Sequence, residues 1–333
     1  MTRIWKQEDG MKEAAEALTS GEAVAFPTET VYGLGADATK EEAVQKIFDA
    51  KGRPADNPLI VHIGDREELA TVAADWTKTA EKCMDAFWPG PLTIIVPSNK
   101  NAAKNVTAGL ETIGVRMPDH PAALELLREV KLPIAAPSAN SSGKPSPTSA
   151  EHVYQDLNGK ISGIVDGGRT GVGVESTVVD CTSEVPVILR PGGVTKEQLE
   201  EVFEEVRVDP ALSDEEEKPK SPGMKYRHYA PEVPLLLVDG DDERFIAVLK
   251  AYQRKGDRVG VIASRELAAQ LDHSRVEVCG SRLDMTEVAV ELYEALRSYK
   301  QSDVDVILAE SFEETKVGVA VMNRLKKAAD RVI

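Results

Sequence analysis

The sequence has little cysteine and no long apolar run. Its 3 cysteines, Cys83, Cys181 and Cys279, are far apart and form neither a CxxC motif nor a Cys/His metal pattern. This argues against a disulfide framework and a zinc site, and it fits a reducing compartment. No window approaches the roughly 20 apolar residues that a membrane-spanning helix needs, and the start MTRIWKQED has no apolar core of a signal peptide. We therefore expect a cytoplasmic protein.

Positive charge is also scarce. The chain has 40 Lys and Arg against 56 Asp and Glu, a net charge of −16, with 42% hydrophobic and 29% charged residues. This composition excludes collagen, coiled coil and wholesale disorder. Because sequence-independent nucleic-acid binding depends on Lys and Arg neutralising phosphates, we expect no tight stand-alone binding to nucleic acid. The overall charge does not exclude a local basic cleft.

Several common catalytic motifs are missing. The sequence contains no HExxH, no GxSxG, no P-loop and no cysteine beside a histidine that would suggest a nucleophile. No metal site is predicted. Small polar and basic residues at the ends of strands in the first 200 residues remain as candidates for chemistry.

The 333 residues correspond to about two domains at roughly 100–200 residues each. Residues 1–203 show strands with few helices, such as those expected at 11–20 and 41–50, so we predict an α/β domain with a mixed sheet. Residues 204–232 are acidic, contain proline and lack periodicity, which predicts a linker. Its second half, SPGMKYRHYAP, is too aromatic and basic for a passive spacer. Residues 233–333 alternate strands and amphipathic helices, which predicts a small doubly wound α/β domain with a parallel sheet.

Two segments of the first domain have competing interpretations. The segment PTETVYGLG at 27–35 directly follows a strand. Composition favours a turn with capping threonines and glycines at positive φ over a ligand loop. Lys51 and Arg53 come after a predicted helix, so they would either stabilise the negative end of the helix dipole or bind phosphate.

Two further polar side chains lie in otherwise apolar strands. Arg116 needs an anionic partner if it is buried, and either an internal carboxylate or a substrate carboxylate would serve. His62 interrupts the strand LIVHI, where a lone histidine is more often a hydrogen-bonded core residue than a catalyst. The loops at 137–148 and 166–177 are either flexible loops or anion-binding nests.

Taken together, the motifs carry a more specific signal than each does alone. Their order is PTETVYGLG, KGRP-x₂-NPLIVHI, FWPGPLTIIV, IGVRMPDHP, APSANSSGKPSPT, DGG, GVEST and LRPGGVT. This order resembles the YrdC-like family, and SPGMKYRHYAP with the C-terminal domain resembles its long two-domain form. The resemblance covers essentially the whole chain and implies a YrdC-like mixed twisted sheet with flanking helices, followed by a C-terminal domain whose role stays open.

The resemblance also implies an activity, that of a nucleotidyltransferase. Members condense L-threonine, bicarbonate and ATP into L-threonylcarbamoyladenylate and pyrophosphate. A partner transferase then forms threonylcarbamoyladenosine at position 37 of tRNAs that read ANN codons. The substrate carbamate is the nucleophile, so no protein nucleophile is required, and Mg²⁺ would be held mainly by the ATP phosphates. An RNA-binding module and an amino-acid-sensing regulator are the alternatives.

The site residues follow from the same resemblance. Lys51 and Arg53 would be catalytic and, with Ser138 and Asn140, would form a KxR…SxN clamp for the phosphates and adenylate. The remaining assignments are Asn57, Ser146 and Arg190 for the nucleotide; Thr30, His62, Arg116, Ser176 and the backbone of Ala136 for threonine; and Tyr226, with Arg227 and His228, for a lid over the nucleotide.

Overall fold

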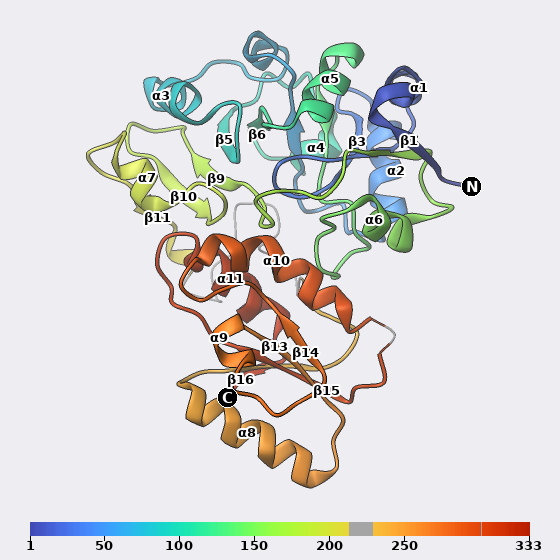
Figure 1. Cartoon of the computed structure of the whole chain (residues 1–333). Helices are drawn as coiled ribbons and strands as arrows, with labels where there is room; N and C mark the ends of the chain where they lie inside the picture. Colours follow the sequence, from blue (N-terminus) through green and yellow to red (C-terminus); the bar gives the residue numbers. More distant parts are fainter. Residues whose placement is uncertain (213–228, 301) are drawn as a thin grey trace. The chain divides into compact units, whose positions relative to one another are not determined.

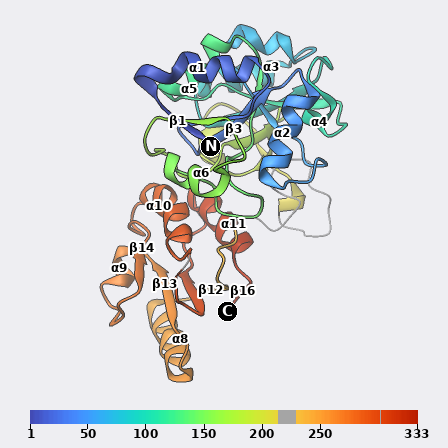
Figure 2. The same cartoon turned by 90° about the vertical axis from the view of Figure 1, so that its right-hand side faces the viewer.

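The computed structural model describes residues 1–212, 229–300 and 302–333, and the chain divides into two compact units (Figures 1 and 2). The first unit holds most of residues 1–212. The second unit holds residues 229–333 together with two short segments, Gly143–Pro145 and Val172–Val174. Each unit has its own sheet.

The first unit is built on a mixed sheet, as the sequence predicts. Its described strands follow the order β1-β8-β2-β3-β7-β4-β6-β5-β9-β10-β11. Strand β4, for example, pairs parallel with β6 and antiparallel with β7. Strand β9 pairs antiparallel with β10, which follows it along the chain. The strands are β1 (Arg3–Lys6), β2 (Val24–Phe26), β3 (Gly33–Asp37), β4 (Ile60–His62), β5 (Leu92–Pro97), β6 (Thr112–Arg116), β7 (Ile134–Ala135), β8 (Gly163–Asp166), β9 (Thr177–Asp180), β10 (Val187–Arg190) and β11 (Arg207–Val208).

Helices cover both faces of this sheet. Val24 and Phe26 of β2 pack in one core cluster with α1 and α5, which lie side by side in Figure 1, whereas Ala25 packs in the other cluster with α2. This is the alternation expected of a strand buried on both faces. The helices are α1 (Gln7–Thr19), α2 (Glu41–Lys51), η1 (Arg66–Thr71), α3 (Lys78–Phe87), α4 (Lys104–Thr107), α5 (Pro121–Val130), α6 (Ala150–Leu157), α7 (Lys196–Glu200) and η2 (Pro210–Leu212).

The helices expected at 11–20 and 41–50 correspond to α1 and α2, whereas α3, α5 and α6 were not predicted. Their start signals are nevertheless present in the sequence. The side chains of Thr77 and Ser149 cap α3 and α6, and Pro121 occupies the first turn of α5. Helix α7 begins with a capping box, in which the side chains of Thr195 and Gln198 bond to each other's backbone.

The glycines of PTETVYGLG play a different part from the one composition favours. Gly33 and Gly35 lie in the buried strand β3, which pairs antiparallel with β2, and neither has a positive φ. A Cβ added at Gly35 would lie 2.7 Å from side-chain atoms of Ile134 and Phe26. The expectation of positive-φ turn glycines is therefore wrong, because close packing of the sheet is what requires glycine here.

The second unit contains the parallel sheet that the sequence predicts. Its order is β14-β13-β15-β12-β16, and every pair is parallel. The elements are β12 (Leu235–Val238), α8 (Asp242–Lys255), β13 (Val259–Ala263), α9 (Arg265–Ala268), β14 (Val276–Val278), α10 (Met285–Ser298), β15 (Val306–Glu310), α11 (Gly318–Ala328) and β16 (Arg331–Val332).

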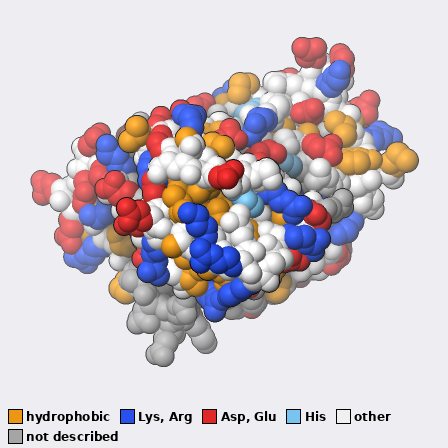
Figure 3. Space-filling model, turned by 60° about the horizontal axis from the view of Figure 1, so that its bottom comes forward, with side chains coloured by type: hydrophobic (Ala, Val, Ile, Leu, Met, Phe, Trp, Pro, Cys, Tyr) orange, Lys and Arg blue, Asp and Glu red, His pale blue; other side chains and the backbone are white. Residues whose placement is uncertain are grey.

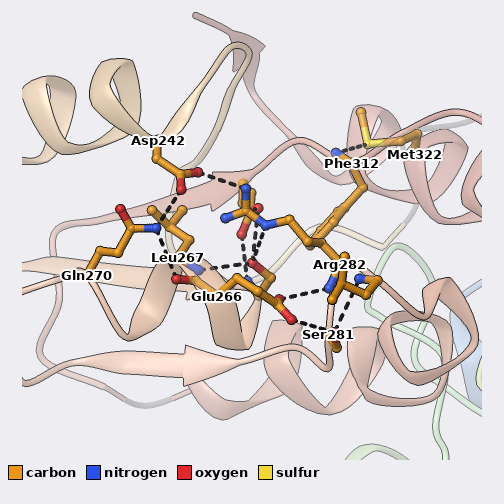
Figure 4. Close-up of polar contacts among 11 residues, drawn as sticks. Asp242, Glu266, Leu267, Gln270, Ser281, Arg282, Phe312 and Met322 are labelled. Atoms are coloured by element: carbon orange, nitrogen blue, oxygen red, sulfur yellow. Dashed lines mark hydrogen bonds and ion pairs between the residues drawn. The ribbon is translucent and has the colours of Figure 1, made fainter.

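A polar network ties together the carboxyl ends of these parallel strands (Figure 4). The Glu310 carboxylate accepts hydrogen bonds from the backbone N–H of Ser264 at 2.6 Å and from its hydroxyl at 3.1 Å. The Arg282 guanidinium lies 2.9 Å from Asp242 and 3.1 Å from Glu310. Burial raises the pKa of Glu310. These hydrogen bonds and ion pairs link β13, β15 and the segments that follow β12 and β14.

Charges of both signs are found on the surface shown in Figure 3. On this surface Lys and Arg side chains are interspersed with Asp and Glu side chains. Among the described residues, no helix has the length and apolar character needed to cross a membrane.

Candidate active site

The first cluster of predicted site residues lies at the end of α2. This helix packs Val44, Ile47 and Phe48 into the core and ends at Gly52, whose φ of 62° is left-handed. Lys51, the last helical residue, is buried, and its ammonium donates to the backbone carbonyls of Ser138 and Asn140. The structure therefore places the Lys51 ammonium against the loop that contains Ser138 and Asn140, two other residues of the predicted clamp.

The loop that contains Ser138 and Asn140 runs beside β3. The Ser138 hydroxyl donates to the side-chain oxygen of Asn140 at 2.6 Å. The backbone N–H of Leu34 donates to the carbonyl of Pro137, and that of Ala139 to the carbonyl of Tyr32, each at 2.8 Å. These bonds hold the predicted clamp loop against the strand that follows Thr30.

Arg53 and Asn57 lie on the segment after α2. The Arg53 guanidinium donates to the carbonyls of Asn57 and Pro58 at 3.4 and 3.3 Å. The Asn57 side chain is buried, and its Nδ2 has no hydrogen-bond partner among the described residues. Because buried polar groups are normally paired, a buried amide donor without a partner is suited to hydrogen bonding with a ligand.

Arg116 ends β6 and is only 4% exposed. Its guanidinium donates to the carbonyl of Gly90 at 3.2 Å and to the hydroxyl of Thr30 at 3.0 Å. Its Nη2 lies 2.6 Å from Oε2 of Glu29. Of the two anionic partners that the sequence leaves open, the structure contains the internal one, a glutamate of the PTETVYGLG segment.

His62 ends β4, directly opposite Arg116 in the parallel pair β4–β6. Burial, and then the positive charge of Arg116, lower the pKa of His62 to about 3, so its ring is neutral near pH 7. The ring packs edge-on against Phe26 with centroids 5.9 Å apart, and Nδ1 has no hydrogen-bond partner among the described residues. The histidine is buried, but that nitrogen lacks the hydrogen bond expected of a core histidine.

The remaining predicted residues meet around the GVEST segment. The Ser146 hydroxyl, fully buried, donates to the Glu175 carboxylate at 2.6 Å. Arg190 donates to the carbonyl of Ser176 at 2.8 Å and to its hydroxyl at 3.0 Å. The Ser176 hydroxyl also lies 2.8 Å from that of Thr93. Arg190 thus holds the Ser176 segment in place.

These clusters belong to one region of the sheet. Strands β3, β7, β4, β6, β5, β9 and β10 are consecutive neighbours in the sheet. The predicted residues lie at or next to these strands: Thr30 before β3, Ala136 and Ser138 after β7, His62 at the end of β4, Arg116 at the end of β6, Ser176 before β9 and Arg190 at the end of β10. An open hollow of about 1070 Å³ elsewhere on the unit, partly lined by Arg3, Trp5 and Lys46, contains none of them.

Some predictions lie beyond these observations. Tyr226, Arg227 and His228 are outside the described residues, so the lid stays a prediction. Within the described part of the chain, no group of three or more His, Cys, Asp or Glu side chains is placed to hold a metal ion.

Sequence reasoning missed the two glutamates that complete these clusters, Glu29 and Glu175. Both lie inside motifs that were noted, PTETVYGLG and GVEST. The sequence pattern that could have identified them is a carboxylate next to small hydroxyl residues at the end of a strand. Which cation or hydroxyl each carboxylate meets depends on the fold.

The fold and the site together define an α/β protein with a Sua5/YciO/YrdC domain. The family model of that name, described as "Telomere recombination", matches residues 16–192. A second model, described as "Threonylcarbamoyl-AMP synthase, C-terminal domain", matches residues 194–330.

Full-length relatives agree with both family models. A threonylcarbamoyl-AMP synthase of Bacillus subtilis is 57% identical over 95% of this chain and 92% of its own length. One of Pyrococcus abyssi is 48% identical over 98% and 94%. The crystal structure of P. abyssi Sua5 complexed with L-threonine has a TM-score of 0.94 and 46% identity, covering 100% of this chain and 99% of that one. The chain belongs to the threonylcarbamoyl-AMP synthase family, in its two-domain form, which confirms the resemblance seen in the motifs.

Proposed function

We propose that this chain condenses L-threonine, bicarbonate and ATP into L-threonylcarbamoyladenylate and pyrophosphate. The observation that carries the proposal is its similarity, over nearly the whole length, to relatives named threonylcarbamoyl-AMP synthase. L-threonine in the P. abyssi structure supports threonine as the amino acid.

The threonine pocket would form around Arg116. A guanidinium binds a carboxylate through two parallel hydrogen bonds, and Arg116 is buried beside the hydroxyl of Thr30. We assign the α-carboxylate of threonine to Arg116. His62 and Ser176, with the backbone of Ala136, would line the same pocket.

The phosphates of ATP would lie at the Lys51 cluster. Lys51, Arg53, Ser138 and Asn140 would supply charge and hydrogen bonds to the transferring phosphate and to pyrophosphate, the leaving group. Asn57, Ser146 and Arg190 would contact the nucleotide. Because the carbamate oxygen of the substrate attacks the α-phosphorus, the protein's contribution is to align substrates, neutralise charge and exclude water.

Mg²⁺ would enter with ATP. Its preference for oxygen ligands and retained water suits binding mainly by phosphate oxygens, and no metal ligand is assigned to the chain. The product would pass to a transferase that modifies adenosine 37 of tRNAs reading ANN codons.

The test is pyrophosphate release from ATP by the full-length chain. We expect release that requires both threonine and bicarbonate, with L-threonylcarbamoyladenylate identified by mass spectrometry. Release without threonine, or with threonine alone giving threonyl-adenylate, would contradict the proposal. Serine should be used better than valine, since a pocket that pairs a hydroxyl rejects an analogue lacking it more strongly than one lacking a methyl.

A further inference from the structure

Glu29 has an unusual environment for a carboxylate. Its side chain is only 12% exposed, and Oε2 lies 2.6 Å from Arg116 Nη2. Both carboxylate oxygens are buried, and neither has a hydrogen-bond partner among the described residues. Burying a carboxylate that accepts no hydrogen bond is costly, so a role as the counter-ion of Arg116 leaves the hydrogen-bonding capacity of Glu29 unused.

The pair of Glu29 and Arg116 is complementary to a free amino acid. The α-carboxylate of an amino acid matches a guanidinium, and its α-ammonium matches a carboxylate. In the absence of substrate the two side chains neutralise each other, which avoids an unpaired buried charge. A zwitterionic ligand can replace each partner by one of its own groups without leaving either charge unpaired.

The reaction adds a demand on the ammonium. Threonine binds as an ammonium ion, which has no lone pair, so it must lose a proton before its nitrogen can attack carbon. The group that removes the proton must reach the ammonium in the bound state.

We propose that Glu29 is the catalytic base that takes this proton, an inference that rests on the proposed function. The threonine ammonium donates one proton to Glu29, and the nitrogen lone pair forms the N–C bond with bicarbonate. One C–O bond of bicarbonate breaks, and its oxygen leaves as water after taking the second nitrogen proton. The product is the carbamate anion, and Glu29 ends protonated. Overall, ammonium plus bicarbonate gives carbamate, water and the proton on Glu29.

The neighbouring histidines are poorer candidates for this step. His62 is neutral near pH 7, because burial and then the charge of Arg116 lower its pKa to about 3, so its ring has no negative charge to attract the ammonium. Burial also lowers the pKa of His120, although the charges of Glu29 and Asp119 act in the opposite direction. Glu29 is the group whose anionic form attracts the ammonium and accepts its proton.

The test compares both directions of the reaction in Glu29→Gln. Forward pyrophosphate release needs the base, and we expect kcat to fall by about 100-fold or more. The reverse step, ATP formation from L-threonylcarbamoyladenylate and pyrophosphate, starts from the nitrogen already acylated and needs no proton removal from an ammonium. We expect its rate to stay within roughly threefold of wild type. Glu13→Gln, which changes an exposed carboxylate of the same unit, should leave both rates unchanged.

A second variant covers the case in which glutamine disturbs Arg116. Glu29→Ala leaves space at the carboxylate position, and added formate should restore part of its forward rate without affecting wild type. Equal loss in both directions with no rescue by formate would overturn the proposal, as would full forward activity of Glu29→Gln. A wild-type chain without threonine- and bicarbonate-dependent pyrophosphate release would instead refute the proposed function.

Discussion

Acidification should destabilise the first unit through His62. The pKa of this histidine is lowered from 6.5 to about 3, first by burial and then by Arg116. Between these two values the unfolded chain binds a proton that the folded chain does not bind. Stability is therefore fully present above pH 6.5 and is lost as the pH falls toward 3.

The size of the effect follows from the shift. Each pH unit within this window costs about 1.4 kcal/mol once the unfolded histidine is protonated. Relative to pH 7, the loss is therefore about 0.7 kcal/mol at pH 6 and about 1.9 kcal/mol at pH 5. His62→Gln removes this titration, so its stability should depend less on pH by the same amounts.

Tryptophan fluorescence offers a selective assay. The chain has 3 tryptophans, and all of them, Trp5, Trp76 and Trp88, belong to the first unit. Urea unfolding followed by their emission at pH 7, 6 and 5 reports that unit in the intact protein. His273→Gln, a substitution in the second unit, is the matched control and should have the wild-type pH dependence.

The comparison of slopes decides the outcome. Because His120 and the carboxylates of the first unit are present in both proteins, their contributions cancel in the difference between wild type and His62→Gln. If the two proteins lose stability in parallel from pH 7 to 5, His62 titrates normally, and its burial against Arg116 does not exclude the charged form.

Three further predictions concern packing, the nucleotide and the second unit. A Cβ at Gly192 would lie 2.3 Å from the carbonyl oxygen of Glu175, so Gly192→Ala should lower the first-unit unfolding midpoint and weaken ATP use. Gly171→Ala, with nothing within 4 Å, should match wild type in the same urea and turnover assays. Lys51→Ala should weaken ATP binding by about 1.5–3 kcal/mol and leave threonine binding largely intact, which calorimetry with each ligand checks. The pKa of Glu266 is lowered from 4.5 to about 2, chiefly by a hydrogen bond from the Ser281 hydroxyl, so stability should be lost as the pH falls through that range. Glu266→Gln should lose less stability over this pH range, as measured by amide exchange in the second unit.

Local patterns in the sequence were sufficient for the fold class. Apolar strands bounded by glycine and proline predicted the mixed sheet, and regular alternation of strands and helices predicted the parallel sheet of the second unit. The helices α3, α5 and α6 were missed even though their N-terminal signals at Thr77, Pro121 and Ser149 are readable. A local signal of this kind marks a possible start, while burial of an apolar face against the sheet decides whether a helix forms.

The order of motifs along the chain identified the family, because it depends only on the residues themselves. Charge and burial arguments also predicted one part of the site. An arginine in an apolar strand requires an anion, so the need for a partner of Arg116 was evident from the sequence.

Which anion meets Arg116 was decided by tertiary structure alone. Glu29 precedes β3 and Arg116 ends β6, and between these strands in the sheet lie β7 and β4. The long-range pairing of β4 with β6 also brings His62 opposite Arg116. Burial at this position is the main cause of the lowered pKa of His62. Neither the partner of a charge nor the environment of a titrating group is encoded at neighbouring positions, because both depend on which distant strands pair when the sheet forms.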